Sequence, residues 1–122
     1  MGKKSWSIVD GYRPPRKKGD ADNYQGHECV LILNRTEKDA HCLIDIYFAD
    51  RPPIKGIEFI APAERISTFY TDDMSLLGKA GIDIMMQYSM HITSDTDIVV
   101  QYGRMDINQD NLAYMVTLGY GE

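Results

Sequence analysis

The chain has 122 residues, 43% of them hydrophobic and 25% charged, and a formal net charge of −5. This length is typical of one domain, and such a domain buries about two-thirds of its unfolded surface, so its core needs no covalent or metal cross-links. No apolar run approaches the roughly 20 residues of a membrane-spanning helix, and no apolar stretch of a signal peptide follows the basic N-terminus. We therefore expect one cytoplasmic domain spanning residues 1–122.

Strand-like segments make up most of the chain. Trp6 and Ile8 alternate on one face of a first strand over 5–9. Two prolines then begin a long loop over 13–26, because proline fixes φ and lacks an N–H donor. Residues 30–33 are apolar without interruption, which is typical of a strand buried on both faces. Including that run, further strands are predicted over residues 27–34, 42–47, 54–60, 65–70, 82–93, 98–104 and 113–120.

A single short helix is predicted over 71–78, where Thr71 or Asp72 could cap the first turn and Gly78 could end the last. About eight strands at intervals of roughly 10–15 residues, without alternating helices, indicate an antiparallel sandwich or barrel. We expect an all-β, antiparallel β-sandwich with at most this one short helix. Both faces of the strand over 113–120 are largely apolar, which either core packing between two sheets or a subunit contact would explain.

Charge is distributed unevenly along the chain. Residues 1–20 carry six basic and two acidic side chains, whereas the remaining 102 residues carry seven basic and sixteen acidic ones. A basic loop on an acidic body can contact nucleic acid or an acidic partner. The residues available for such a contact are Arg13, Arg16, Lys17 and Lys18. Alternatively, this segment is a solvated loop, because the acidic body repels phosphate.

The cysteines and histidines do not form a recognisable metal or redox motif. Cys29 and Cys42 are not arranged as Cys-x-x-Cys or as a four-ligand zinc pattern, and in a cytosolic chain we expect them to be free, buried thiols. His27, His41 and a carboxylate would be suitable zinc ligands by type. However, histidines on separate strands are common without metal, and we expect neither a metal nor a cofactor.

No catalytic motif stands out. The chain lacks a glycine-rich phosphate loop and a Gly-x-Ser-x-Gly nucleophile turn. His27-Glu28 begins a metalloprotease-like pattern, but Leu31 stands where the second histidine is required, and the segment is strand-like rather than helical. We therefore predict that the protein is not an enzyme.

Polar residues gather at the ends of two apolar strands. Gln101, Arg104 and Asp106 follow one apolar run, and His27 and Glu28 precede another. An amide, a guanidinium and carboxylates are groups that bind a polar ligand, and the chain's tyrosines offer flat amphipathic surfaces for a sugar. The same groups could instead form an internal hydrogen-bonded corner, with Arg104 paired to a carboxylate.

The order of several motifs resembles the sensory rhodopsin transducer family over nearly the whole chain. The residues that carry the resemblance are Trp6-Ser7-Ile8, Gly11-Tyr12-Arg13-Pro14-Pro15, His27-Glu28, Ile32-Leu33-Asn34, Asp39-Ala40-His41, Ile44-Asp45-Ile46-Tyr47, Asp50-Arg51, Ile98-Val99-Val100-Gln101 and Arg104-Met105-Asp106. Each motif is short, but their order and spacing together are specific. The positions that match the family's polar motifs, and that become candidate ligand-binding residues, are His27, Glu28, Asn34, Asp50, Arg51, Gln101, Arg104 and Asp106.

The resemblance implies a jelly-roll-like β-sandwich that assembles as a cytoplasmic homotetramer. It also implies a signalling role, because the best-known family member is regarded as a relay from a membrane sensory rhodopsin; DNA binding has been ascribed to that member too. The family is likened to carbohydrate-binding modules, which implies that members without a rhodopsin sense a sugar or a related small molecule.

Three functional hypotheses follow. The preferred one is a non-catalytic signal-transducer or sensor module that binds a small, polar, sugar-like ligand. The alternative is a protein-interaction relay for a membrane sensory rhodopsin or another receptor. The third is a DNA-binding regulator that uses the basic N-terminal segment.

Overall fold

Strands dominate the computed structural model of the protein, which describes residues 2–15, 26–106 and 113–122. The elements, in chain order, are β1 (Lys3–Tyr12), β2 (His27–Asn34), β3 (Ala40–Tyr47), β4 (Ile54–Ala61), β5 (Arg65–Tyr70), α1 (Met74–Leu77), a 3-10 turn (Gly78–Ala80), β6 (Gln87–Asp106), β7 (Ala113–Leu118) and β8 (Tyr120–Gly121). Every strand pairing in the described chain is antiparallel. The structure thus confirms the prediction of an all-β antiparallel fold with one short helix.

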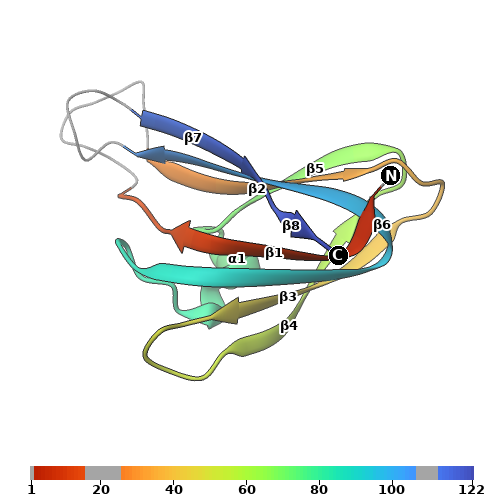
Figure 1. Cartoon of the computed structure of the whole chain (residues 1–122). Helices are drawn as coiled ribbons and strands as arrows, with labels where there is room; N and C mark the ends of the chain where they lie inside the picture. Colours follow the sequence, from red (N-terminus) through yellow and green to blue (C-terminus); the bar gives the residue numbers. More distant parts are fainter. Residues whose placement is uncertain (1, 16–25, 107–112) are drawn as a thin grey trace.

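Two sheets form the two layers of a sandwich (Figure 1). Sheet A has the strand order β4-β3-β6-β1-β8, and sheet B has the order β5-β2-β6-β7. Strand β6 belongs to both, because its first half pairs with β1 and β3 and its second half pairs with β2 and β7. In Figure 1, β6 runs along the lower layer, bends at the right-hand end and returns in the upper layer.

The prediction of two separate strands over 82–93 and 98–104 is wrong. The chain continues through Ser94 and Asp95 as the single strand β6, which is 20 residues long. These polar residues lie where β6 leaves sheet A, and the Asp95 carboxylate accepts a hydrogen bond from the backbone N–H of His41 (2.9 Å). Polar side chains therefore mark a bend between the layers rather than a loop.

The core lies between the two sheets and is filled mainly by aliphatic side chains. Besides Tyr102, its largest fully buried apolar members are Ile32, Ile44, Ile46, Met90, Ile92, Ile98, Val30 and Val100. Strand β2 contributes only one of its faces, because Val30 and Ile32 are 0% exposed whereas Leu33 is 42% exposed. The prediction that residues 30–33 are buried on both faces is therefore wrong.

Strand β7 pairs only with β6 and forms an edge of sheet B. Its side chains are exposed, with Tyr114 at 55%, Val116 at 47% and Leu118 at 63%. Core packing within this chain therefore does not explain why both faces of the strand are apolar.

The helix α1 begins later than the sequence pattern predicts. Asp73, rather than Thr71 or Asp72, caps its first turn: the Asp73 carboxylate accepts a hydrogen bond from the backbone N–H of Ser75 (3.0 Å). The backbone carbonyl of Asp73 accepts from the N–H of Leu77 (2.8 Å). The hydrogen bonds that the Asp73 carboxylate accepts from the hydroxyl of Ser75 (2.6 Å) and from the N–H of Ser75 lower the pKa of this carboxyl.

The two cysteines are free and buried, as predicted. Cys29 lies in β2 of sheet B and Cys42 lies in β3 of sheet A, and these strands do not pair. Burial raises the pKa of both thiols, which keeps them in the unreactive protonated form at neutral pH.

Candidate functional site

A buried carboxylate lies at the end of the sandwich where β1 ends and β2 begins, on the left in Figure 1. Glu28 is only 2% exposed. It accepts hydrogen bonds from the backbone N–H of Tyr12 (2.7 Å) and from the hydroxyls of Tyr102 and Thr71. Three donors therefore satisfy the carboxylate in the interior, where an unpartnered charge would be costly.

This arrangement joins parts of the chain that are distant in sequence. Tyr12 is the last residue of β1, Thr71 follows β5, and Tyr102 lies in the second half of β6. The backbone N–H of Thr71 also donates to the carbonyl oxygen of Glu28 (3.1 Å). Glu28 therefore holds both sheets together at this end of the sandwich.

Arg104 lies beside this buried network. It is the direct cross-strand partner of Glu28 in the β2–β6 pair. Its Nη1 lies 3.5 Å from the hydroxyl oxygen of Tyr102, and its Cζ lies 5.3 Å from the centroid of the Tyr12 ring. A partly buried guanidinium against an aromatic face, next to a buried carboxylate, is an arrangement that can bind a polar ligand.

Two tyrosine hydroxyls near Glu28 stay protonated over a wide pH range. Burial raises the pKa of Tyr102 and of Tyr88, and the negative charge of Glu28 raises both further. Tyr102 therefore remains a hydrogen-bond donor to Glu28. The hydroxyl of Tyr88 is buried and has no hydrogen-bond partner in the described part of the chain.

The structure separates the other predicted residues on β2 and β6 by face. Asp106 follows Tyr102 and Arg104 at every second position of β6 and so lies on the same side of the strand. Gln101 lies on the opposite side and is exposed. His27 pairs with Met105, also on the opposite side. The His27 ring contacts the rings of Tyr70 and Tyr114, at centroid distances of 5.9 and 6.4 Å.

Asn34 lies at the other end of β2 and organises a turn. Its Nδ2 donates to the carbonyl oxygens of Lys38 (2.8 Å) and Ala61 (3.0 Å). Its Oδ1 accepts from the backbone N–H (3.0 Å) and the hydroxyl (2.8 Å) of Thr36. Both amide protons and the amide oxygen are thus engaged within the protein.

Asp50 and Arg51 lie in the loop after β3, and both are exposed. Arg51 lies over the ring of Phe48, with its Cζ 3.9 Å from the ring centroid. It donates to the carbonyl oxygen of Gly81 (2.7 Å). Arg51 therefore anchors the segment that leads into β6.

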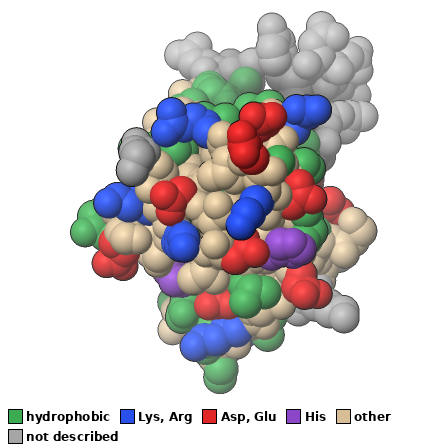
Figure 2. Space-filling view, turned by 90° about the vertical axis from the view of Figure 1, so that its right-hand side faces the viewer, with side chains coloured by type: hydrophobic (Ala, Val, Ile, Leu, Met, Phe, Trp, Pro, Cys, Tyr) green, Lys and Arg blue, Asp and Glu red, His purple; other side chains and the backbone are tan. Residues whose placement is uncertain are grey.

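The predicted basic contact surface is only partly described. Arg13 donates to the carbonyl oxygen of Ile82 (2.5 Å) and so supports the segment before β6; Arg16, Lys17 and Lys18 lie outside the described residues. On the face in Figure 2, Lys and Arg side chains are interspersed with Asp and Glu. Among the described residues on that face, the basic side chains do not form the single-sign patch that favours nucleic acid.

Sequence reasoning missed the roles of Tyr12 and Thr71 in this site. The sequence pattern indicated Thr71 as a helix cap. Its hydrogen bond to Glu28 depends instead on the position of the end of β5, which the sequence pattern does not indicate. Tyr12 contributes its backbone N–H, which no side-chain pattern can indicate.

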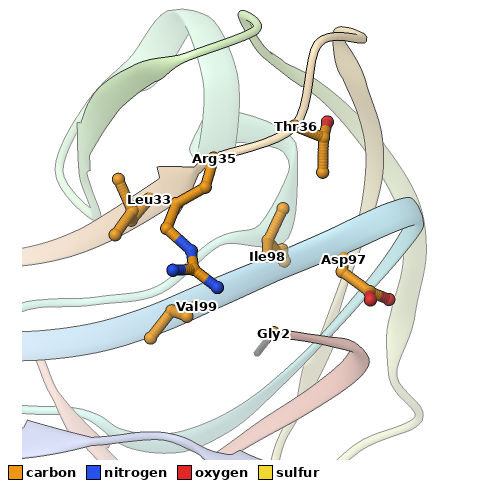
Figure 3. A pocket seen from close by; sticks show the side chains of 7 residues that line it. All are labelled: Gly2, Leu33, Arg35, Thr36, Asp97, Ile98 and Val99. Carbon is orange, nitrogen blue, oxygen red and sulfur yellow. The ribbon is translucent and has the colours of Figure 1, made fainter.

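A hollow of about 280 Å³ lies at the opposite end of the sandwich (Figure 3). It is lined by Leu33, Ile98 and Val99, with Arg35 and Asp97 contributing charged groups. In the described part of the chain, no group of three or more His, Cys, Asp or Glu side chains is arranged to hold a metal ion. No helix there is long and apolar enough to cross a membrane.

Comparisons with known proteins agree with this architecture. The chain superposes on the crystal structure of Thermotoga maritima 1070 with a TM-score of 0.84 and 27% identity, covering 99% of this chain and 96% of that one. It superposes on the Anabaena sensory rhodopsin transducer with a TM-score of 0.74 and 34% identity, covering 88% and 91%. No curated protein matches. A family model matches residues 1–121, and the chain belongs to the Anabaena sensory rhodopsin transducer family.

Proposed function

We propose that this protein is a non-catalytic, cytoplasmic signal-transducing module that works as a homotetramer and relays a signal from a membrane sensory rhodopsin or another receptor. The observation that carries the proposal is the outer face of sheet B, the face turned away from the core. Strand register places fourteen residues on it: Ile66, Leu33, Val99, Thr68, Leu31, Gln101, Leu118, Tyr70, Cys29, Gly103, Val116, His27, Met105 and Tyr114.

This face is apolar and open to solvent. Ile66 is 67% exposed, Leu118 63%, Tyr114 55% and Leu33 42%. The fourteen positions include no lysine, arginine, aspartate or glutamate. A monomeric protein in water rarely exposes so continuous an apolar surface, and such surfaces mark protein contacts. A second copy of the chain presents the same flat apolar face and is therefore a matching partner.

The test of assembly compares two leucines of similar exposure. Leu33 on the outer face of sheet B is 42% exposed, and Leu43 on the outer face of sheet A is 46% exposed. Light scattering after size-exclusion chromatography should show a tetramer for the unmodified protein and for Leu43→Asp. Leu33→Asp should dissociate it, because an aspartate buried in a subunit contact is unpaired. A monomeric unmodified protein, or equal masses for both variants, would contradict this arrangement.

The relay role is supported by the 34% identity to the Anabaena sensory rhodopsin transducer. The measurement is binding of the intact protein to a detergent-solubilised sensory rhodopsin, with a light-driven proton pump of the same fold as control. We expect binding to the sensory rhodopsin alone. Equal binding to both proteins, or binding to neither, would contradict a sensory rhodopsin as the partner. The proposal would then be limited to a receptor of another kind.

A second candidate function is sensing of a small, polar, sugar-like ligand at the Arg104 end of the sandwich. The supporting observation is the partly buried Arg104 guanidinium against the ring of Tyr12, beside Glu28. Arg104→Ala should abolish a ligand-induced rise in melting temperature while leaving the unliganded protein folded. Arg35→Ala, which removes an exposed arginine at the opposite end, is the matched control. Unfolding of Arg104→Ala would instead identify Arg104 as part of a structural corner.

A further inference from the structure

A gap in the strand pairing marks the place where β6 passes from sheet A to sheet B. In the β1–β6 pair, Lys3 is the partner of Ile98 but Ser5 is the partner of Thr93, so the register shifts between them. Residues 95–97 of β6 have no cross-strand partner in the described part of the chain. The hollow of about 280 Å³ lies beside this gap (Figure 3).

The backbone of β1 is held closely against β6 at this hollow. Trp6 is 5% exposed, and its indole N–H donates to the backbone carbonyl oxygens of Lys3 (3.0 Å) and Ile98 (3.1 Å). Gly2 lies directly against the backbone of Ile98, because a Cβ at Gly2 would be 2.5 Å from the Ile98 carbonyl oxygen. Only glycine permits so close an approach. The folded backbone therefore defines one wall of the hollow.

Two groups of opposite charge line the hollow. Arg35 follows the end of β2, and Asp97 lies in the unpaired part of β6. In Figure 3, the guanidinium of Arg35 and the side chain of Asp97 lie on either side of Ile98. Among the described residues, neither charged group makes a hydrogen bond or an ion pair. Both charges are therefore free to interact with a ligand.

Apolar side chains line the hollow beside these charges. Leu33 and Val99 are cross-strand partners in the β2–β6 pair, and Leu33 is 42% exposed. Together with Ile98 they offer an apolar surface for a carbon chain. A volume of about 280 Å³ is just below the roughly 300 Å³ at which pockets for drug-sized ligands begin. The hollow therefore suits a smaller molecule.

We propose that this hollow binds a small zwitterionic amino acid. The guanidinium of Arg35 donates two parallel hydrogen bonds to the ligand carboxylate, and the carboxylate of Asp97 accepts from the ligand ammonium. The carbon chain between these two groups packs on the apolar side chains. A ligand with a single charge would lie near a like charge, an anion near Asp97 or a cation near Arg35, which weakens its binding.

This site is separate from those of the proposed functions. It lies at the end of the sandwich opposite Glu28 and Arg104. Leu33 and Val99 also belong to the outer face of sheet B, so the ligand lies at the margin of the proposed subunit contact. Binding needs the residues of only one copy of the chain and does not depend on the proposed assembly.

The test is a titration of the isotopically labelled full-length protein with leucine, 4-aminobutyrate and 6-aminohexanoate, followed by amide chemical-shift changes. We expect saturable shifts centred on the amides of Arg35, Asp97 and Val99 with at least one of these probes. The analogues of that probe that lack its ammonium or its carboxylate should bind at least about tenfold more weakly, or by about 1.4 kcal/mol. For 6-aminohexanoate these analogues are hexanoate and pentylamine.

Variants of the two charged residues decide the assignment. Arg35→Gln and Asp97→Asn should each weaken binding of the zwitterion at least about tenfold, or by about 1.4 kcal/mol, with unchanged circular dichroism. Asp97→Asn should also bind the analogue that lacks the ammonium more tightly than the unmodified protein does, because the like charge is removed. Arg65→Gln and Asp83→Asn remove exposed charges outside the hollow and should bind as the unmodified protein does.

Three results would overturn the proposal. The first is that no probe shifts the amides of Arg35, Asp97 and Val99 at millimolar concentration. The second is that the singly charged analogues bind as tightly as the zwitterion, or that the two control variants weaken binding as much as the variants of the hollow. The third is that the shifts centre on Tyr12 and Arg104, which would support the second candidate function instead.

Discussion

Replacing Glu28 by alanine should cost the protein a large part of its stability. The carboxylate accepts three hydrogen bonds, from the N–H of Tyr12 and the hydroxyls of Thr71 and Tyr102. Hydrogen bonds to a charged group contribute about 1.5–3 kcal/mol each, so their loss amounts to at least about 4.5 kcal/mol. Relief from burying a carboxylate offsets part of this. We expect a net loss of about 3 kcal/mol.

Thermal and urea unfolding, followed by circular dichroism, measure this loss. For a chain of this length, about 3 kcal/mol corresponds to a fall in melting temperature of roughly 9–15 °C. Glu58→Ala, which removes an exposed carboxylate from β4, is the matched control and should change stability by less than about 0.5 kcal/mol. If Glu28→Ala were equally mild, the buried carboxylate would not be what joins the two sheets at this end, and the reasoning would be refuted.

Three further outcomes follow from the buried groups. The pKa of the Tyr102 and Tyr88 hydroxyls is raised in the folded protein, so as the pH rises the unfolded chain loses these two protons before the folded protein does. The free energy of unfolding should therefore be constant with respect to these groups below about pH 10 and fall above it by up to about 2.7 kcal/mol per pH unit. Tyr88→Phe should make this fall shallower in pH-dependent urea unfolding. Gly11→Ala places a Cβ 2.5 Å from the Tyr88 ring and should lower the melting temperature through a loss of about 1–3 kcal/mol. Cys29 and Cys42 should react with a thiol reagent only as the protein unfolds; fast reaction of the native protein would contradict their burial.

The alternation of apolar and polar residues was sufficient to predict most strands. The predicted segment 65–70 has the bounds of β5, and the predicted segment 42–47 lies within β3. This succeeds because a strand with one buried face must repeat its apolar residues with period two. The same pattern could not distinguish a loop at Ser94 and Asp95 from a bend, since polar side chains suit both.

The candidate site was only partly predictable. The sequence singled out Glu28 and Arg104 as polar residues at the ends of apolar strands, and strand register makes them direct neighbours. It grouped His27 and Gln101 with them, although the structure places both on the opposite face. Sequence proximity cannot indicate the face, because successive side chains of a strand point to opposite sides.

By itself, the sequence determined the fold class, the thiol state of the cysteines and the family, since these depend on local periodicity, composition and the order of short motifs. The tertiary structure alone decided that Glu28 meets Tyr102, 74 positions away. It also decided that the paired positions on the outer face of sheet B carry no Lys, Arg, Asp or Glu, whereas the outer face of sheet A carries Asp45 and His91 beside the exposed Leu43. Each of these outcomes depends on which strands pair and in which register, and that is set by packing between segments far apart in the chain.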